Sequence, residues 1–181
     1  KGEFSIRFSI GSARAGCQKI QEYIMKKVRY AVKEDIDDWM EVVGSSVDGY
    51  PYLNEKDYIC RLRNYIAKRH GIVLEKDGVI AGVMAFSVRS SETVHIEYLA
   101  VLPQNRKAGL YKILVSKLAE ELFPGREISI TTYRENDRAD TGYRKELERL
   151  GFTGKELLTE FGYPTQRFIY RRGDENEGKE E

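Results

Sequence analysis

The chain has 181 residues, 41% of them hydrophobic and 33% charged, a composition typical of one globular domain. A formal net charge of +1 leaves no overall field to attract nucleic acid, and no apolar run reaches the about 18 residues that a membrane span needs. Two cysteines and two histidines without ligand spacing argue against a metal site. We therefore expect a cytoplasmic protein without metal, in which Cys17 and Cys60 are buried or partly buried free thiols.

Residues 1–27 form an N-terminal extension whose status the sequence leaves open. Phe4, Ile6, Phe8 and Ile10 alternate with polar residues, as in a strand. Met25, however, resembles a natural start of translation. The extension is thus either added sequence ahead of the natural protein or a genuine extra strand that serves packing or dimer contacts.

Residues 28–88 predict one strand, two helices and a hairpin. Val28, Tyr30 and Val32 alternate as a strand, and a first helix follows that buries Trp39 in the core. Asn54 is placed to cap a second helix, which Gly71 would end. Two strands joined by a turn at 76–78 are then expected over 72–75 and 79–88.

The stretch from Val94 to Phe123 is the centre of the prediction. It reads as a strand in which Val94, Ile96, Tyr98 and Ala100 alternate with His95, Glu97 and Leu99. Pro103 ends the strand, a short basic loop follows, and an amphipathic helix begins after Gly109. Free N–H groups at a helix start beside two cationic side chains favour an anion.

The remaining residues predict a crossover and a final hairpin. A strand over 128–133 should run parallel to the Val94 strand, because a helix connects the two. A helix over about 141–150 and strands over 155–161 and 165–171 follow. We expect a mixed α/β fold whose mostly antiparallel sheet has about seven strands and about four flanking helices. The charged tail, 173–181, is expected to be disordered.

Over 28–172 the chain resembles the GNAT superfamily of acetyl-CoA-dependent N-acetyltransferases. Arg106 and Gly109 match that family's coenzyme motif, which reads Arg or Gln, two residues, Gly, one residue, and Gly or Ala. Tyr111 stands where the small residue is usual. The sequence Leu-Gly-Phe at 150–152 matches the end of the family's late helix, and Asn136 falls where an asparagine is common.

The resemblance implies a coenzyme site between two parallel strands that splay apart. The pantetheine arm would pair with the backbone of the Val94 strand like an extra strand, and the pyrophosphate would lie on N–H groups at the helix start. The residues implied in binding acetyl-CoA are Leu99, Ala100, Val101, Arg106, Lys107, Ala108, Gly109, Leu110, Tyr111 and Asn136.

The resemblance also suggests catalytic residues. Glu97 lies mid-strand beside the splay and is our choice of general base; a solvated surface carboxylate is the alternative. His95 could assist in proton relay or be passive. The family's usual tyrosine acid falls on Leu147, so Tyr143, one turn earlier, is the candidate; Tyr133 or water are alternatives.

The acceptor is expected to be a primary amine of a small molecule or a peptide. Aromatic and acidic residues that could line its site are Tyr50, Tyr52, Glu160 and Tyr163, although packing explains each equally well. A non-catalytic acyl-CoA-binding or interaction module on the same fold is the alternative function. A homodimer is possible, since members of the family often form dimers.

Overall fold

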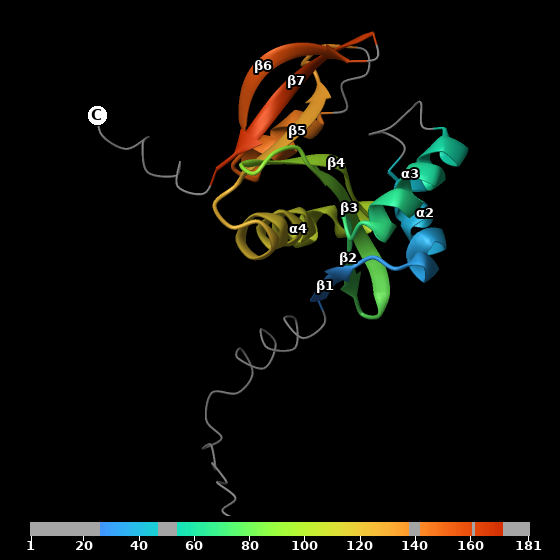
Figure 1. Cartoon of the computed structure of the whole chain (residues 1–181). Coiled ribbons are helices and arrows are strands. Elements are labelled where there is room, and N and C mark those ends of the chain that lie inside the picture. The colour runs from blue at the N-terminus through green and yellow to red at the C-terminus, as the bar shows by residue number, and fades with distance from the viewer. Residues whose placement is uncertain (1–25, 47–53, 138–141, 161, 172–181) are drawn as a thin grey trace, which may run out of the picture.

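A seven-stranded sheet in the order β1-β2-β3-β4-β5-β7-β6 organises the chain (Figure 1). The computed structural model describes residues 26–46, 54–137, 142–160 and 162–171. Among the described strands, only β4 and β5 pair in parallel. The mixed, mostly antiparallel sheet of the sequence prediction is therefore confirmed. The strands are β1 Lys26–Tyr30, β2 Gly71–Lys76, β3 Val79–Val88, β4 Thr93–Val101, β5 Glu127–Tyr133, β6 Thr153–Glu160 and β7 Tyr163–Tyr170.

Helices cover both faces of the sheet (Figure 1). On one face, Tyr58 of α3 packs on Tyr98 of β4 with ring centroids 5.1 Å apart. On the other, Leu114 of α4 lies so close to β3 that a Cβ at Gly82 would be 3.1 Å from its Cδ1 atom. The helices are α2 Ile36–Gly44, α3 Glu55–Ala67, α4 Leu110–Ser116 and α5 Tyr143–Arg149, with the 3-10 turns η1 Lys33–Asp35 and η3 Pro103–Ala108 and the π-helix η4 Lys117–Leu122.

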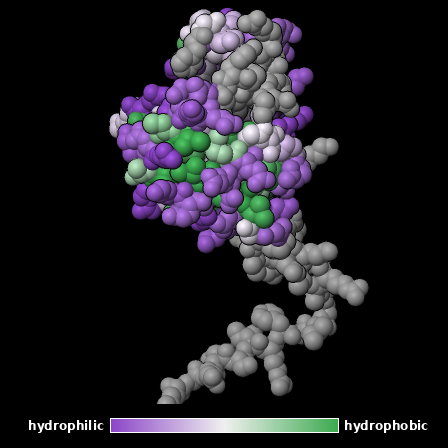
Figure 2. Space-filling model, turned by 90° about the vertical axis from the view of Figure 1, so that its right-hand side faces the viewer, coloured by the Kyte–Doolittle hydropathy of each residue, from purple (hydrophilic) through white to green (hydrophobic). Residues whose placement is uncertain are grey.

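The side of the molecule that carries α2 and α3 has a mostly hydrophilic surface with apolar residues gathered near its centre (Figure 2). Beneath this surface Trp39 is fully buried, as predicted, and its Nε1–H donates to the Tyr58 hydroxyl at 2.9 Å. Asn54 caps α3, also as predicted, by accepting from the N–H groups of Lys56 and Asp57. These helices thus place their apolar stripes on the sheet.

Two local expectations were wrong. Gly71 does not end the second helix, which stops at Ala67; Arg69 takes the left-handed conformation, φ 56°, in the connection to β2. Cys60 is exposed on α3 rather than buried, since the helix turns Tyr58 and Leu62 to the core instead. Cys17 lies outside the described residues.

A β-bulge in β4 changes the predicted alternation of its side chains. Ala85 of β3 pairs with Tyr98 while the next residue, Phe86, pairs with Ile96, so Glu97 is one extra residue without a partner in that ladder. The bulge shifts the faces of all residues after it. Ile96 and Val101 therefore both face α4, and Tyr98 faces α3. The expectation that Tyr98 shares a face with Ile96 was wrong.

The parallel pairing of β4 with β5 ends at this bulge. The register runs from Thr93 opposite Glu127 to Ile96 opposite Ile130 and stops there. β4 continues to Val101, and β5 continues to Tyr133 while paired only with β7 on its other side. A bulged strand bends, which accounts for the separation. The two strands open beyond their middle, as the sequence resemblance implied.

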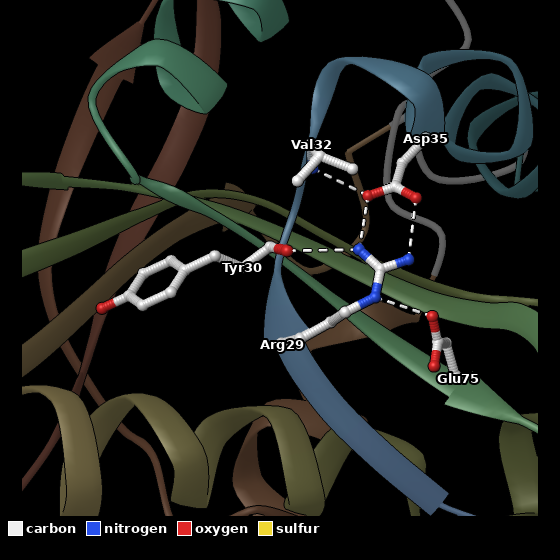
Figure 3. Close-up of polar contacts among 5 residues, drawn as sticks. All are labelled: Arg29, Tyr30, Val32, Asp35 and Glu75. Atoms are coloured by element: carbon white, nitrogen blue, oxygen red, sulfur yellow. Dashed lines mark hydrogen bonds and ion pairs between the residues drawn. The ribbon is translucent and has the colours of Figure 1, made fainter.

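An ion-pair cluster fixes the first strand to the start of α2 (Figure 3). The Arg29 guanidinium donates to both carboxylate oxygens of Asp35, at 2.6 and 2.8 Å, and to Glu75 Oε1 at 2.7 Å. The N–H of Val32 also donates to Asp35, at 2.8 Å. The Asp35 side chain is only 9% exposed, so losing one partner would leave a poorly solvated charge.

This cluster makes stability depend on pH. Burial raises the pKa of the Asp35 carboxyl, but hydrogen bonds from Arg29 and from the Val32 N–H outweigh it, so that the pKa lies below its ordinary value. Such a carboxylate contributes stability above its unfolded pKa of about 3.9 and loses this contribution as pH falls through the folded pKa. Asp35→Asn should lower the free energy of unfolding by about 1–3 kcal/mol at pH 7 and by less at pH 3.

Urea denaturation at both pH values measures this difference. Asp38→Asn is the matched control, because Asp38 lies three residues further on, in the first turn of α2, and is exposed. It should change stability little at either pH. An equal loss for Asp35→Asn at both pH values would contradict the assignment.

Candidate functional site

Two tyrosines fill the opening between β4 and β5. The Tyr143 hydroxyl donates to the carbonyl of Leu99 at 3.5 Å, and Tyr111 is buried at the start of α4. The two rings meet edge to face, with centroids 6.0 Å apart. The Ser46 hydroxyl donates to the carbonyl of Val101 at 3.4 Å, so two carbonyls of β4 accept from side chains beyond the last residue that pairs with β5.

Tyr111 turns inward from the start of α4 and is 7% exposed. Burial raises the pKa of its phenol, although the positive charge of Arg106 and hydrogen bonds from Val101 and Arg106 favour the phenolate. The ring is turned into the molecule, where it packs against Tyr143, and a large residue therefore fits where the family motif has a small one.

The basic segment is a 3-10 helix, η3, rather than the irregular loop that the sequence predicted. Gly109 follows it in the left-handed conformation, φ 71°, and no side chain caps the start of α4. The first N–H groups of α4 thus have no side-chain acceptor, which suits an anion. Arg106 is exposed beside them; the Lys107 side chain lies outside the described part of the chain.

Glu97 is held through one oxygen. Its Oε1 accepts from the Ser87 hydroxyl at 2.5 Å and from Arg89 Nη2 at 2.7 Å. Its side chain is 24% exposed. Burial is the main cause that raises the pKa of Tyr65 on α3, and the negative charge of Glu97 is the second. Within the described residues no hydrogen bond reaches Oε2, so this oxygen can accept a proton from a molecule on the α3 side.

His95 is a partly buried neighbour of Glu97. Its Nδ1 lies 2.9 Å from Ser129 Oγ on β5, opposite it in the parallel ladder. Burial lowers the pKa of His95. The negative charge of Glu97 acts in the opposite direction, while the positive charges of Arg89 and Arg167 lower the pKa further. The imidazole is therefore neutral at pH 7. Ser87, Arg89 and Ser129 were missed at the sequence level because no motif marks residues that contact only across strands.

The remaining predicted residues fall into four groups. Tyr163 packs on Tyr133 with centroids 5.8 Å apart, and Glu160 is its partner in the β6–β7 ladder. Asn136 is exposed in a turn with φ 64°. Tyr50 and Tyr52 lie outside the described residues. Buried positions at the end of β4 and the start of α4 are Leu99, Ala100, Val101 and Leu110, and Ala108 is partly buried.

Within the described ranges of the chain, no group of three or more metal-ligating side chains lies close enough together to hold an ion. No helix in these ranges is both long enough and apolar enough to cross a bilayer.

The model of the acetyltransferase (GNAT) family matches residues 31–152. The chain belongs to this family. The match extends from the end of β1 to the turn before β6, and it includes the bulge, the uncapped helix start and both site tyrosines. No curated protein matches the chain significantly.

Solved structures share the fold of this GNAT domain. A GNAT acetyltransferase from Bacillus cereus ATCC 10987 is 20% identical, with TM-score 0.62, over 81% of this chain and 97% of its own. The ribosomal-protein-S18-alanine N-acetyltransferase of Escherichia coli is 16% identical, with TM-score 0.63, over 81% and 94%. The PaiA N-acetyltransferase of Thermoplasma acidophilum, in complex with coenzyme A, is 16% identical, with TM-score 0.60, over 80% and 99%.

The left-handed glycine before α4 gives a test of the site's backbone. Gly109→Ala should destabilise the protein by about 1 kcal/mol, because a Cβ at φ 71° is strained although it would meet no atom within 4 Å. Thermal denaturation measures the loss. Gly44→Ala at the end of α2 is the matched control, since its Cβ also meets no atom and its φ is ordinary. Equal effects of the two changes would contradict the strain argument.

Proposed function

We propose that this GNAT domain transfers an acetyl group from acetyl-CoA to a primary amine of a small molecule or a peptide. The observation that carries the proposal is the opening of β4 from β5 at Glu97, beside an uncapped helix start and Arg106. Family membership and the coenzyme A bound to the Thermoplasma relative support the choice of coenzyme.

The residues at the opening fit a pantetheine diphosphate. The N–H groups at the start of α4 and the Arg106 guanidinium suit two phosphates, since the helix dipole and the side-chain charge have the same sign. The backbone between Leu99 and Val101 can pair with the amides of pantetheine as a strand would. When bound there, acetyl-CoA supplies an activated acyl group.

The acceptor must lose a proton before it can attack. An alkylammonium with a pKa near 10 costs about 4 kcal/mol to deprotonate at pH 7. In the proposal Glu97 accepts this proton at Oε2, directly or through water, while Ser87 and Arg89 hold Oε1. The amine nitrogen then bonds to the acyl carbon, the carbon–sulfur bond breaks, the nitrogen releases its second proton to water, and the thiolate takes up a proton.

Tyr143 is the proposed donor of that last proton. Its hydroxyl lies at the Leu99 carbonyl, inside the opening, and the side chain is half-buried. Leu147, at the family's usual tyrosine position, is fully buried in the core and has no proton to give. Water is the alternative donor, because a thiolate leaves readily.

Acceptor recognition is assigned to the β6–β7 hairpin and the segment before α3. The packed rings of Tyr163 and Tyr133 can line one side of the acceptor site. The half-buried carboxylate of Glu160 can attract a cationic amine. Tyr50 and Tyr52 remain candidates. The peptide acceptor named for the Escherichia coli relative favours keeping peptide amines beside small molecules.

A non-catalytic coenzyme-binding module is the second candidate. The observation that favours it is the pair of departures at Tyr111, whose ring is buried against that of Tyr143, and Leu147, which cannot act as an acid. Stabilisation by coenzyme A without thiol release on any amine would support this module.

Glu97→Gln tests the general base. Turnover should fall by about 10²- to 10⁴-fold, the usual contribution of a positioned base, while the Kd of acetyl-CoA stays the same. Thiol release over an amine panel and isothermal titration calorimetry measure the two quantities. Glu148→Gln, an exposed change on α5, serves as the control. Unchanged turnover would remove Glu97 from the mechanism.

Tyr143→Phe tests the proton donor. Turnover should fall by about 10-fold or more, since the thiolate must then be protonated by water, and the Kd of acetyl-CoA should change far less. Steady-state rates measured across pH give the turnover, and calorimetric titration gives the Kd of acetyl-CoA. Tyr30→Phe on β1 is the matched control. An unchanged rate and pH profile would exclude Tyr143 as the acid.

A further inference from the structure

His95 and Ser129 form a hydrogen-bonded pair one residue before the ladder of β4 and β5 ends. His95 Nδ1 and Ser129 Oγ lie 2.9 Å apart, and the two residues are opposite each other in that ladder. Ser129 is 4% exposed, whereas His95 is only half-buried. The proposed acetyl transfer uses neither side chain so far, although histidine is the side chain that most often transfers protons in enzymes.

The hydrogen bonds of Ser129 decide which nitrogen of His95 carries the proton. A hydroxyl has one proton to donate, and Ser129 Oγ donates it to the Val94 carbonyl at 3.5 Å. Oγ therefore accepts in its shorter bond with His95, and the donor in that bond is Nδ1–H. The lone pair of the neutral ring is then on Nε2, which makes no hydrogen bond within the described residues.

His95 and Glu97 project from the same face of β4. Both are neighbours of Ile96, which faces α4, so both turn toward the α3 side. Ser87 lies next to both. It is opposite His95 in the β3–β4 ladder, where side chains are about 5 Å apart, and its hydroxyl donates to Glu97 Oε1 at 2.5 Å. Two proton acceptors, Glu97 Oε2 and His95 Nε2, therefore lie close together on one face.

The proposed reaction removes two protons from the amine nitrogen. The first goes to Glu97 before the attack. The second leaves after the nitrogen has bonded to the acyl carbon, at a moment when a protonated Glu97 cannot accept it. A second base on the same face meets this need.

We propose that Ser129 holds His95 in the Nδ1–H form, and that His95 Nε2 accepts the second proton of the amine, directly or through one water. The inference rests on the proposed function, since it supposes acetyl transfer to an amine beside Glu97. The carbon–sulfur bond breaks, the thiolate takes its proton from Tyr143, and the imidazolium releases the extra proton to solvent. His95 is a catalytic residue in this scheme, and Ser129 is a positioning residue.

The charged groups around His95 fit this step. Burial lowers its pKa, the negative charge of Glu97 raises it, and the positive charges of Arg89, beyond the end of β3, and Arg167 on β7 lower it. The ring is thus neutral at pH 7 and ready to accept a proton, and its imidazolium readily returns that proton to water. Because a base must be unprotonated, kcat should fall as pH drops below the ordinary histidine pKa of about 6.5.

A passive role makes a different prediction. A pair that only joins β4 to β5 contributes to stability, and its loss would lower the melting temperature. It would leave kcat and the pH profile of the folded enzyme unchanged. The tautomer of His95 would then have no effect on turnover.

Nuclear magnetic resonance with ¹⁵N-labelled histidine measures the tautomer directly. In the wild-type protein at pH 7 the His95 ring should carry its proton on Nδ1. In Ser129→Ala the proton should move to Nε2, the site that free histidine prefers. Ser129→Thr keeps the hydroxyl and should keep the wild-type form. A wild-type ring protonated on Nε2 would overturn the inference, whatever the activity.

Thiol release with an amine that the wild-type protein acetylates gives kcat across pH. His95→Asn keeps an N–H for Ser129 but has no basic nitrogen, so kcat should fall by about 10-fold or more and the His95 step in the pH profile should disappear. Ser129→Ala should lower kcat by about 5-fold, the effect of about one hydrogen bond, and Ser129→Thr should restore it. The Kd of acetyl-CoA should stay the same in each variant.

His70→Asn is the matched control for the loss of a histidine. The His70 ring packs on Phe86, with centroids 5.2 Å apart, and takes no part in the site. This change should leave kcat and the pH profile unaltered. Circular dichroism verifies that each variant is folded, and the tautomer measurement on wild type needs no variant.

The outcomes separate this inference from the proposed function. Unchanged kcat and pH profile in folded His95→Asn, with an active wild type, overturn the inference and leave acetyl transfer standing, with water as the second proton acceptor. A wild type that binds acetyl-CoA but acetylates no amine overturns the proposed function and the proton step with it. Loss of kcat together with the predicted tautomer supports both.

Discussion

The site depends on the point where β4 separates from β5. Four residue pairs hold the two strands in parallel, and the ladder stops at Ile96, one residue before the bulge at Glu97. Beyond that point β4 stays in the sheet only through β3, while β5 follows β7. Unpaired backbone groups are costly when buried, so the opening must be filled by something that can bond to them.

Side-chain hydroxyls meet that requirement in this chain. The Leu99 carbonyl accepts from Tyr143 of α5, and the Val101 carbonyl accepts from Ser46, which follows α2. The two donors thus come from separate parts of the sequence and reach the same stretch of β4. A ligand that pairs with this stretch would have to replace the same hydrogen bonds, so the stability of the opening and access to it are opposed.

The elements were predictable where one residue pattern repeats over several positions. Alternation gave β1 and β4, and a turn signal gave the β2–β3 hairpin. A capping side chain gave the start of α3, and the helical connection gave the parallel pair of β4 and β5. The bulge was not predictable, because Glu97 fits the alternation of its own strand and is extra only relative to β3. Likewise Arg89 and Ser87 became visible only once the hairpin brought them to Glu97.

The extra residue at position 97 is not needed for the packing of β4. Ile96 and Tyr98 pair with consecutive residues of β3, Phe86 and Ala85, and Glu97 is inserted between them. Deleting Glu97 would leave these pairs in place and keep Leu99 and Val101 on the α4 face, because a regular strand alternates in the same way. What the insertion adds is the bend at which pairing with β5 stops, so the opening depends on a residue that the hydrophobic core could do without.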